Sequence, residues 1–153
     1  MNKITLSLSL NEARIIHNGA SQERKLELEE LFSELKPISI IDRVKTYEDA
    51  LRVLGKKDFN RENLYPREIA RRKLEIIIEA LNEGWKPDFN SIKQSKWYCC
   101  FYESETGIGF SFSNNSPANA ITYFGVLFCL KSKELADYIG QQFLYLYKEM
   151  LLA

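Results

Sequence analysis

Catalysis by a histidine base has one candidate in this chain, His17, because the 153-residue sequence contains a single histidine. A catalytic base needs a partner group that orients it and a substrate proton within hydrogen-bond reach. His17 lies between Ile16 and Asn18 near the expected end of a helix, where an imidazole can bind terminal carbonyl groups. We therefore predict a structural or surface role for His17 and no histidine-dependent mechanism.

The three cysteines, Cys99, Cys100 and Cys129, are the candidates for thiol chemistry or metal binding. A structural zinc site takes four Cys or His ligands with paired spacing, which the sequence lacks. A reactive thiolate needs a cation, an imidazole or a helix N-terminus beside it, whereas apolar and aromatic residues flank these cysteines. Neighbouring strand residues point to opposite faces, so Cys99 and Cys100 are poorly placed for a disulfide. We predict reduced, packed thiols, no metal and no cofactor.

Carboxylates and glycines around residue 106 share single features with two kinds of catalytic or cofactor site. Glu103 and Glu105 form an acid pair, but glycosidase acids act in a cleft that shifts their pKa values. Gly107 and Gly109 lack the third glycine and the following helix of a dinucleotide-binding loop. The segment is typical of a hairpin turn, so we predict no catalytic residue there. An enzyme whose site is assembled from scattered Glu, Tyr and Ser side chains stays open as an alternative.

Basic residues are concentrated in the middle of the chain. Residues 43–73 contain ten basic and five acidic side chains, a local charge of +5, whereas the whole chain has a net charge of zero. The candidate phosphate contacts are Arg67, Arg71, Arg72 and Lys73. They indicate salt-dependent nucleic-acid binding or a solvated helix face, in which Glu68 pairs with Arg72 and Glu75 lies near Arg71. No aromatic residue interrupts the basic run, so base stacking is not predicted there.

Aromatic residues are concentrated at the other end, since thirteen of the nineteen lie in residues 97–153. Side chains alternate between the faces of a strand, so one row of the segment WYCCFYE should pack on helices. The other row, which contains Tyr98 and Tyr102, is either a second core layer or a solvent-facing groove. With Trp85, these tyrosines form a candidate aromatic surface, and a small-ligand-binding domain with an aromatic groove is one alternative function.

The last predicted helix, capped by Ser132, is apolar around most of its circumference. Its face toward the sheet contains Leu135, Ile139, Phe143, Leu146 and Met150. A helix of this kind buries more than one side. The second side either packs on N-terminal segments or forms a dimer or partner interface, because large exposed apolar patches are rare in monomers. The residues assigned to this interface are Tyr138, Leu144, Tyr145, Tyr147 and Leu151.

An α+β fold is predicted to position these residues. Periodicity and capping signals predict helices at residues 9–19, 21–36, 47–55 and 66–82, and strands at residues 97–103, 110–113 and 121–130. Residues 37–46 are predicted to be extended or irregular, and the polar residues 56–65 to form an internal linker. Alternation at residues 4–10 indicates a further strand or extended segment. We predict one domain over residues 1–153. A helical N-terminal front (1–84) packs on a back (85–153) with a small antiparallel sheet of three to four strands, closed by the C-terminal amphipathic helix.

Composition narrows the class of protein. A hydrophobic content of 45% and a charged content of 27% are ordinary for a globular domain. The balanced charge creates no overall attraction to nucleic acid or to anionic lipid. The apolar N-terminal run is too short for a signal peptide or a membrane span. We predict a cytoplasmic protein that does not bind membranes.

Four stretches resemble one group of proteins: LNEARIIHNGA, VKTYEDALRVLG, KLEIIIEALNEGWKPDFN and FCLKSKELADYIGQQFLYLYKEML. Together they resemble uncharacterised small proteins of Bacteroides-group gut bacteria, their phages and mobile elements. The resemblance implies a phage or mobile-element origin and an accessory role inside the host cell, with no assigned chemistry. We therefore predict a non-enzymatic protein that acts through a protein partner or through self-association.

Overall fold

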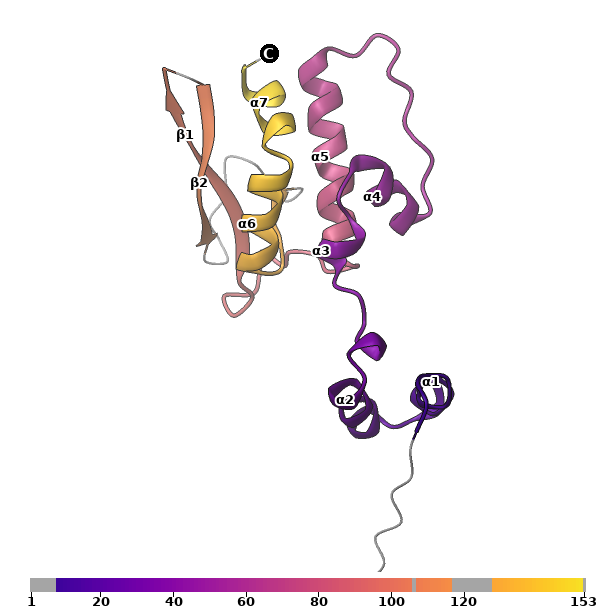
Figure 1. Cartoon of the computed structure of the whole chain (residues 1–153). Coiled ribbons are helices and arrows are strands. Elements are labelled where there is room, and N and C mark those ends of the chain that lie inside the picture. Colours follow the sequence, from indigo (N-terminus) through magenta and orange to yellow (C-terminus); the bar gives the residue numbers. More distant parts are fainter. Residues whose placement is uncertain (1–7, 106, 117–127, 153) are drawn as a thin grey trace, which may run out of the picture. The chain divides into compact units, whose positions relative to one another are not determined.

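A computed structural model describes residues 8–105, 107–116 and 128–152 (Figure 1). Over these residues the protein is α+β, with seven α-helices, a short 3-10 helix and a two-stranded antiparallel sheet. The predicted α+β class is thus confirmed. The chain divides into two compact units after Ile38, so the predicted boundary near residue 84 lies inside the second unit. That the whole chain forms one domain stays a prediction.

The N-terminal unit contains α1 (Leu10–Gly19), α2 (Gln22–Leu31) and the 3-10 helix η1 (Ser33–Leu35). A capping box between Ser9 and Glu12 begins α1 as predicted, and the Ser21 hydroxyl caps α2. The second helix is shorter than predicted, because α2 ends at Leu31 and η1 forms the last turn before Pro37. The apolar spacing continues past the point where the helical hydrogen bonds stop.

One polar contact joins the two helices of this unit. His17 Nε2 lies 2.6 Å from Glu29 Oε1, and both side chains are mostly buried. Ala13 of α1 and Leu28 of α2 are fully buried. The structural role predicted for His17 thus takes the form of a contact between α1 and α2.

The second unit contains α3 (Ile40–Arg43), α4 (Tyr47–Leu54), α5 (Pro66–Asn82), β1 (Lys96–Ser104), β2 (Gly107–Ser116), α6 (Lys133–Gln142) and α7 (Leu144–Leu152). Figure 1 shows α6 and α7 between the sheet and α5, and α4 packs on α5. The core of this unit therefore has two faces, one between the sheet and the C-terminal helices and one between α7 and α5.

Local signals set the ends of α4 and α5 as predicted. A capping box between Thr46 and Asp49 begins α4, and Gly55, with a φ of 63°, ends it. Pro66 occupies the first turn of α5. The prediction of extended or irregular structure at residues 37–46 is wrong only at residues 40–43, where the one-turn helix α3, capped by Ser39, forms. A helix of four residues is too short to produce a recognisable period.

The sheet is a hairpin in which Cys99 lies opposite Ser113, with a shift of register between Cys100 and Phe101. The predicted three to four strands are not confirmed. Residues 4–7 and 121–127, which include most of the two other predicted strands, lie outside the described residues. The described end of the third forms an isolated antiparallel bridge, Leu130 with Trp97, closed by hydrogen bonds of 3.0 and 2.8 Å.

The sequence predicts one continuous C-terminal helix, but the structure has two. The helix breaks at Phe143, where φ is −111° and ψ is 23°. The break lets α6 pack on both strands while α7 packs on α5. Gly140 permits the close approach of α6 to β2, because a Cβ atom there would lie 2.3 Å from the ring of Phe110. The second apolar side of the helix is therefore largely covered by α5 of the same chain.

Candidate binding surfaces

A groove of about 520 Å³ lies beside β1, where Tyr98, Cys100 and Tyr102 of the strand meet Leu151 and Leu152 of α7. The exposed fractions are 53% for Tyr102, 41% for Leu151 and 56% for Leu152. A groove lined by large, partly exposed apolar side chains can receive an apolar group from another molecule. We call it the β1–α7 groove.

Both rows of β1 contribute to the lining of this groove, since Cys99 and Phe101 line it together with Tyr98, Cys100 and Tyr102. Trp97, Cys99 and Phe101 form the row that packs on the core, as the sequence predicts. The ring of Tyr102 lies over its cross-strand partner Gly109, where an added Cβ atom would approach the ring to 2.4 Å. Glycine therefore makes room for the ring, and Tyr102 is held at the rim of the groove.

The groove combines residues that the sequence assigns to two separate surfaces. Leu151 comes from the predicted interface of the last helix, and Tyr98 and Tyr102 come from the predicted aromatic surface. Trp85 does not join them: it is half-buried in the loop after α5 and is not among the lining residues. No sequence pattern connects Tyr102 with Leu151, because they meet only when α7 packs beside the hairpin.

Tyr147 requires a correction, because it belongs to the core and not to an interface. Its side chain is 2% exposed, and its ring centroid lies 4.5 Å from that of Phe101. Its hydroxyl donates to Cys99 Sγ at 3.8 Å. Alanine at both Tyr147 and Leu151 would therefore remove core packing as well as exposed surface, so such a double variant would not isolate an interface.

The other three predicted interface residues of the C-terminal helices differ in their contacts and in their exposure to solvent. Tyr138 binds within the chain, since its hydroxyl donates to the carbonyl oxygen of Val44 at 2.7 Å. Leu144 is half-buried, and Tyr145 is 56% exposed. Neither lines the β1–α7 groove. A binding role for Tyr138, Leu144 and Tyr145 stays a separate prediction, which binding in the β1–α7 groove does not require.

Burial weakens the acidity of two of the cysteine thiols. Burial raises the pKa of Cys99 to about 12 and also raises that of Cys100. Cys99 Sγ donates to the carbonyl oxygen of Ala136 at 3.1 Å. Over the residues that the structure describes, no three His, Cys, Asp or Glu side chains gather to hold a metal ion. Cys99 therefore acts as a packing residue.

A buried polar contact joins β2 to α6. Ser113 Oγ donates to Asp137 Oδ1 at 2.5 Å, and Lys133 Nζ lies 2.5 Å from Asp137 Oδ2. Burial opposes ionisation of Asp137, but the bonds from Lys133 and Ser113 outweigh it and lower the pKa. The contact therefore holds β2 against α6.

We expect Asp137→Asn to lower the free energy of unfolding by about 1–2 kcal/mol at pH 7, because the charged hydrogen bonds are lost. The lowered folded-state pKa means that this stabilisation is present above the unfolded-state value of about 3.9 and is lost as the pH falls through the folded-state value. Urea unfolding of both proteins at neutral and strongly acidic pH measures the difference. An effect that is the same size in acid would contradict a role for the charge.

The predicted phosphate contacts on α5 have four different surroundings. Arg71 Nε lies 2.9 Å from Glu75 Oε1, which confirms the predicted proximity. The predicted pair of Glu68 with Arg72 is wrong, because Glu68 Oε2 accepts from the backbone N–H of Tyr65 at 2.9 Å at the start of the helix. Arg67 is exposed to solvent, and Arg72 and Lys73 lie against aromatic rings.

Comparison of the chain with protein-family models, with curated proteins and with solved structures finds no match. Among the described residues, no helix is both long enough and apolar enough to cross a membrane. The function of the protein therefore has to be inferred from its own surfaces.

Proposed function

We propose that the protein is a non-enzymatic accessory protein, of phage or mobile-element origin, that binds a segment of a partner protein in the β1–α7 groove. The observation that carries this proposal is the meeting of Tyr102, Leu151 and Leu152 in one groove, each at least two-fifths exposed. Exposed apolar side chains that lie together are typical of an interaction site.

The lining favours a protein segment over a small molecule. Small-molecule sites enclose most of the ligand and aim several polar groups at it. Here the side-chain polar groups besides the thiols are the hydroxyls of Tyr98 and Tyr102 and the carboxylate of Glu103. Tyrosine is enriched at protein interfaces, since its ring is apolar and its hydroxyl tolerates water.

The charge of the groove indicates the chemistry of the partner. Glu103 is the one charged side chain among the described residues that line it. Complementary charge steers association and selects partners. We propose that the bound segment presents apolar side chains next to a lysine or an arginine.

The test is purification of the tagged full-length protein from a gut-bacterial host after nuclease treatment, followed by titration of the identified partner in purified form. The groove variant is Tyr102→Ala combined with Leu151→Ala, and the matched control is Tyr145→Ala. Tyr145 is an equally exposed tyrosine, on α7 but outside the groove. We expect the groove variant to weaken binding about tenfold or more and the control to leave the affinity nearly unchanged.

Three results would overturn this proposal. The folded groove variant could bind as tightly as the wild type, or the Tyr145→Ala control could lose the partner equally. The third is recovery of the protein without any partner. A dimer in light scattering that the groove variant abolishes would assign the groove to a second copy of the chain instead.

A further inference from the structure

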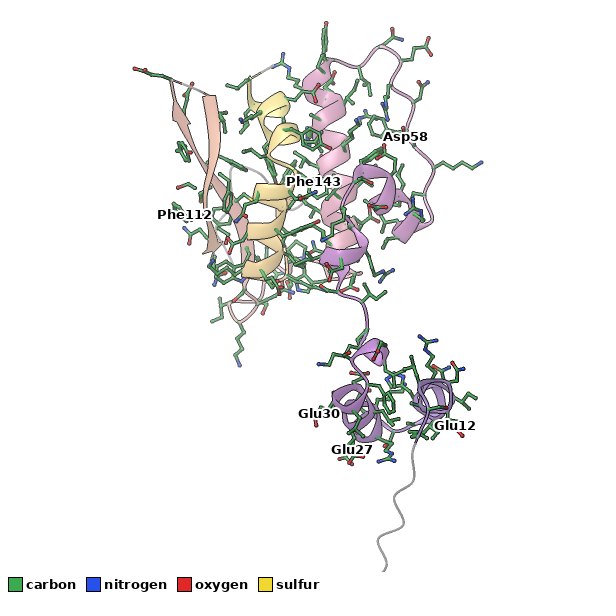
Figure 2. The ribbon with its side chains drawn as sticks, viewed as in Figure 1. Glu12, Glu27, Glu30, Asp58, Phe112 and Phe143 are labelled. Atoms are coloured by element: carbon green, nitrogen blue, oxygen red, sulfur yellow. The ribbon has the colours of Figure 1, made fainter. Side chains whose placement is uncertain are left out.

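Two aromatic rings anchor the loop between α4 and α5. The rings of Tyr47 and Phe59 meet edge to face, with centroids 6.4 Å apart. The Tyr47 hydroxyl donates to Asp58 Oδ1 at 2.6 Å, and Figure 2 shows Asp58 on this loop. This arrangement holds residues 58 and 59 against the start of α4.

Three cations gather around these two rings. Arg61 Cζ lies 5.8 Å and Arg72 Cζ 5.7 Å from the centroid of Phe59. Lys73 Nζ lies 5.3 Å from the centroid of Tyr47. The attraction between a cation and an aromatic face therefore brings a loop residue and two helix residues into one cluster. We call Arg61, Arg72 and Lys73 the basic cluster.

The basic cluster has an excess of positive charge. Asp58 pairs with Arg61, and the hydrogen bonds from Tyr47 and Arg61 lower the pKa of Asp58 and keep it ionised. Over the described part of the chain, Arg72 and Lys73 form no ion pair. Of the three cations only Arg61 is in an ion pair, so the charges of Arg72 and Lys73 are not neutralised by an ion pair among the described residues. Such an excess attracts an anionic ligand.

An exposed aromatic ring lies at the start of the helix that contains Arg72 and Lys73. Tyr65 immediately precedes α5 and is 69% exposed. Arg72 lies two helical turns further on, about 10 Å along the axis. Proteins that bind single strands combine cations for the phosphates with aromatic rings on which bases stack. The sequence shows the cations of this combination in the basic run but not the aromatic ring, because no aromatic residue interrupts that run.

We infer that the basic cluster and Tyr65 form a binding site for single-stranded nucleic acid, in which Arg72, Lys73 and Arg61 contact phosphates and a base stacks on Tyr65. This site is separate from the β1–α7 groove, since the two share no residue. The duplex is the less suitable ligand, because its paired bases do not present a free face to a surface tyrosine.

The test is fluorescence anisotropy with the full chain and a labelled single-stranded DNA of about 20 nucleotides, at increasing salt from about 50 mM. Three phosphate contacts predict a slope of about −2 for the logarithm of affinity against the logarithm of salt concentration. We expect Arg72→Gln to weaken binding about 5- to 10-fold and to reduce the slope by about 0.7. Tyr65→Ala should weaken binding to the single strand more than binding to a duplex of the same sequence.

Arg71→Gln is the matched control, because it removes the same charge from the neighbouring residue, which is paired with Glu75. We expect it to change the affinity less than twofold. Absence of binding at low salt, or equal losses for Arg71→Gln and Arg72→Gln, would overturn the site. Preference for the duplex would overturn the stacking role of Tyr65. Circular dichroism checks folding, and Lys73→Gln replaces Arg72→Gln if that variant unfolds.

Discussion

Phe143→Ala is expected to lower the free energy of unfolding by about 3–5 kcal/mol, the range for removing a buried aromatic side chain. Phe143 is 1% exposed and lies where α6 and α7 meet (Figure 2). Its ring contacts the ring of Tyr138 edge to face, with centroids 6.2 Å apart. The substitution removes a buried ring from the hydrophobic core at the junction of α6 and α7. A loss of this size is a large part of the stability of a small domain.

Urea unfolding followed by circular dichroism measures this effect, and Phe112→Ala is the matched control. Phe112 is 53% exposed on β2, so the same chemical change should cost less than about 1 kcal/mol there. Figure 2 shows the two phenylalanines on separate elements of this unit. Equal losses for the two variants would show that Phe143 does not anchor the joint.

Asn82→Ala is expected to have the second-largest effect, about 2–4 kcal/mol, because it removes two buried hydrogen bonds. Asn82 is 4% exposed at the end of α5. Its Nδ2 donates to the carbonyl oxygen of Cys129 at 2.8 Å, and its Oδ1 accepts from the backbone N–H of Lys131 at 3.0 Å. The residue between these two, Leu130, pairs with Trp97 of β1. One amide side chain therefore connects α5 to the segment beside the sheet.

Two measurements test this prediction: the melting temperature from thermal unfolding and the exchange rate of a single backbone amide. We expect a lower melting temperature and faster exchange of the Lys131 amide, because that amide loses its acceptor. Asn90→Ala is the control, since Asn90 is exposed and, among the described residues, its hydrogen bond is made by the backbone N–H, which donates to Asp88. If Asn82→Ala were no more destabilising than Asn90→Ala, the two hydrogen bonds would not hold this segment in place.

The amino-acid sequence by itself was sufficient for most helix boundaries of the second unit. Thr46, Gly55 and Pro66 act within one helical turn, so their effect does not depend on the rest of the fold. The row of β1 that packs on the core was also predictable, because strand alternation is a local property. The four-residue helix α3 was missed for the opposite reason, since it is shorter than the period that would reveal it.

Tertiary structure alone decided what the apolar and basic side chains contact. A helical period shows that Tyr147 and Leu151 belong to an apolar helix, but only packing places Tyr147 in the core and Leu151 in the β1–α7 groove. In the same way, Phe59 and Arg72 meet because the loop after α4 folds back on α5. Local patterns report the preferences of single elements. Which side chains share a surface depends on contacts between residues far apart in the chain, and these form only when the elements pack.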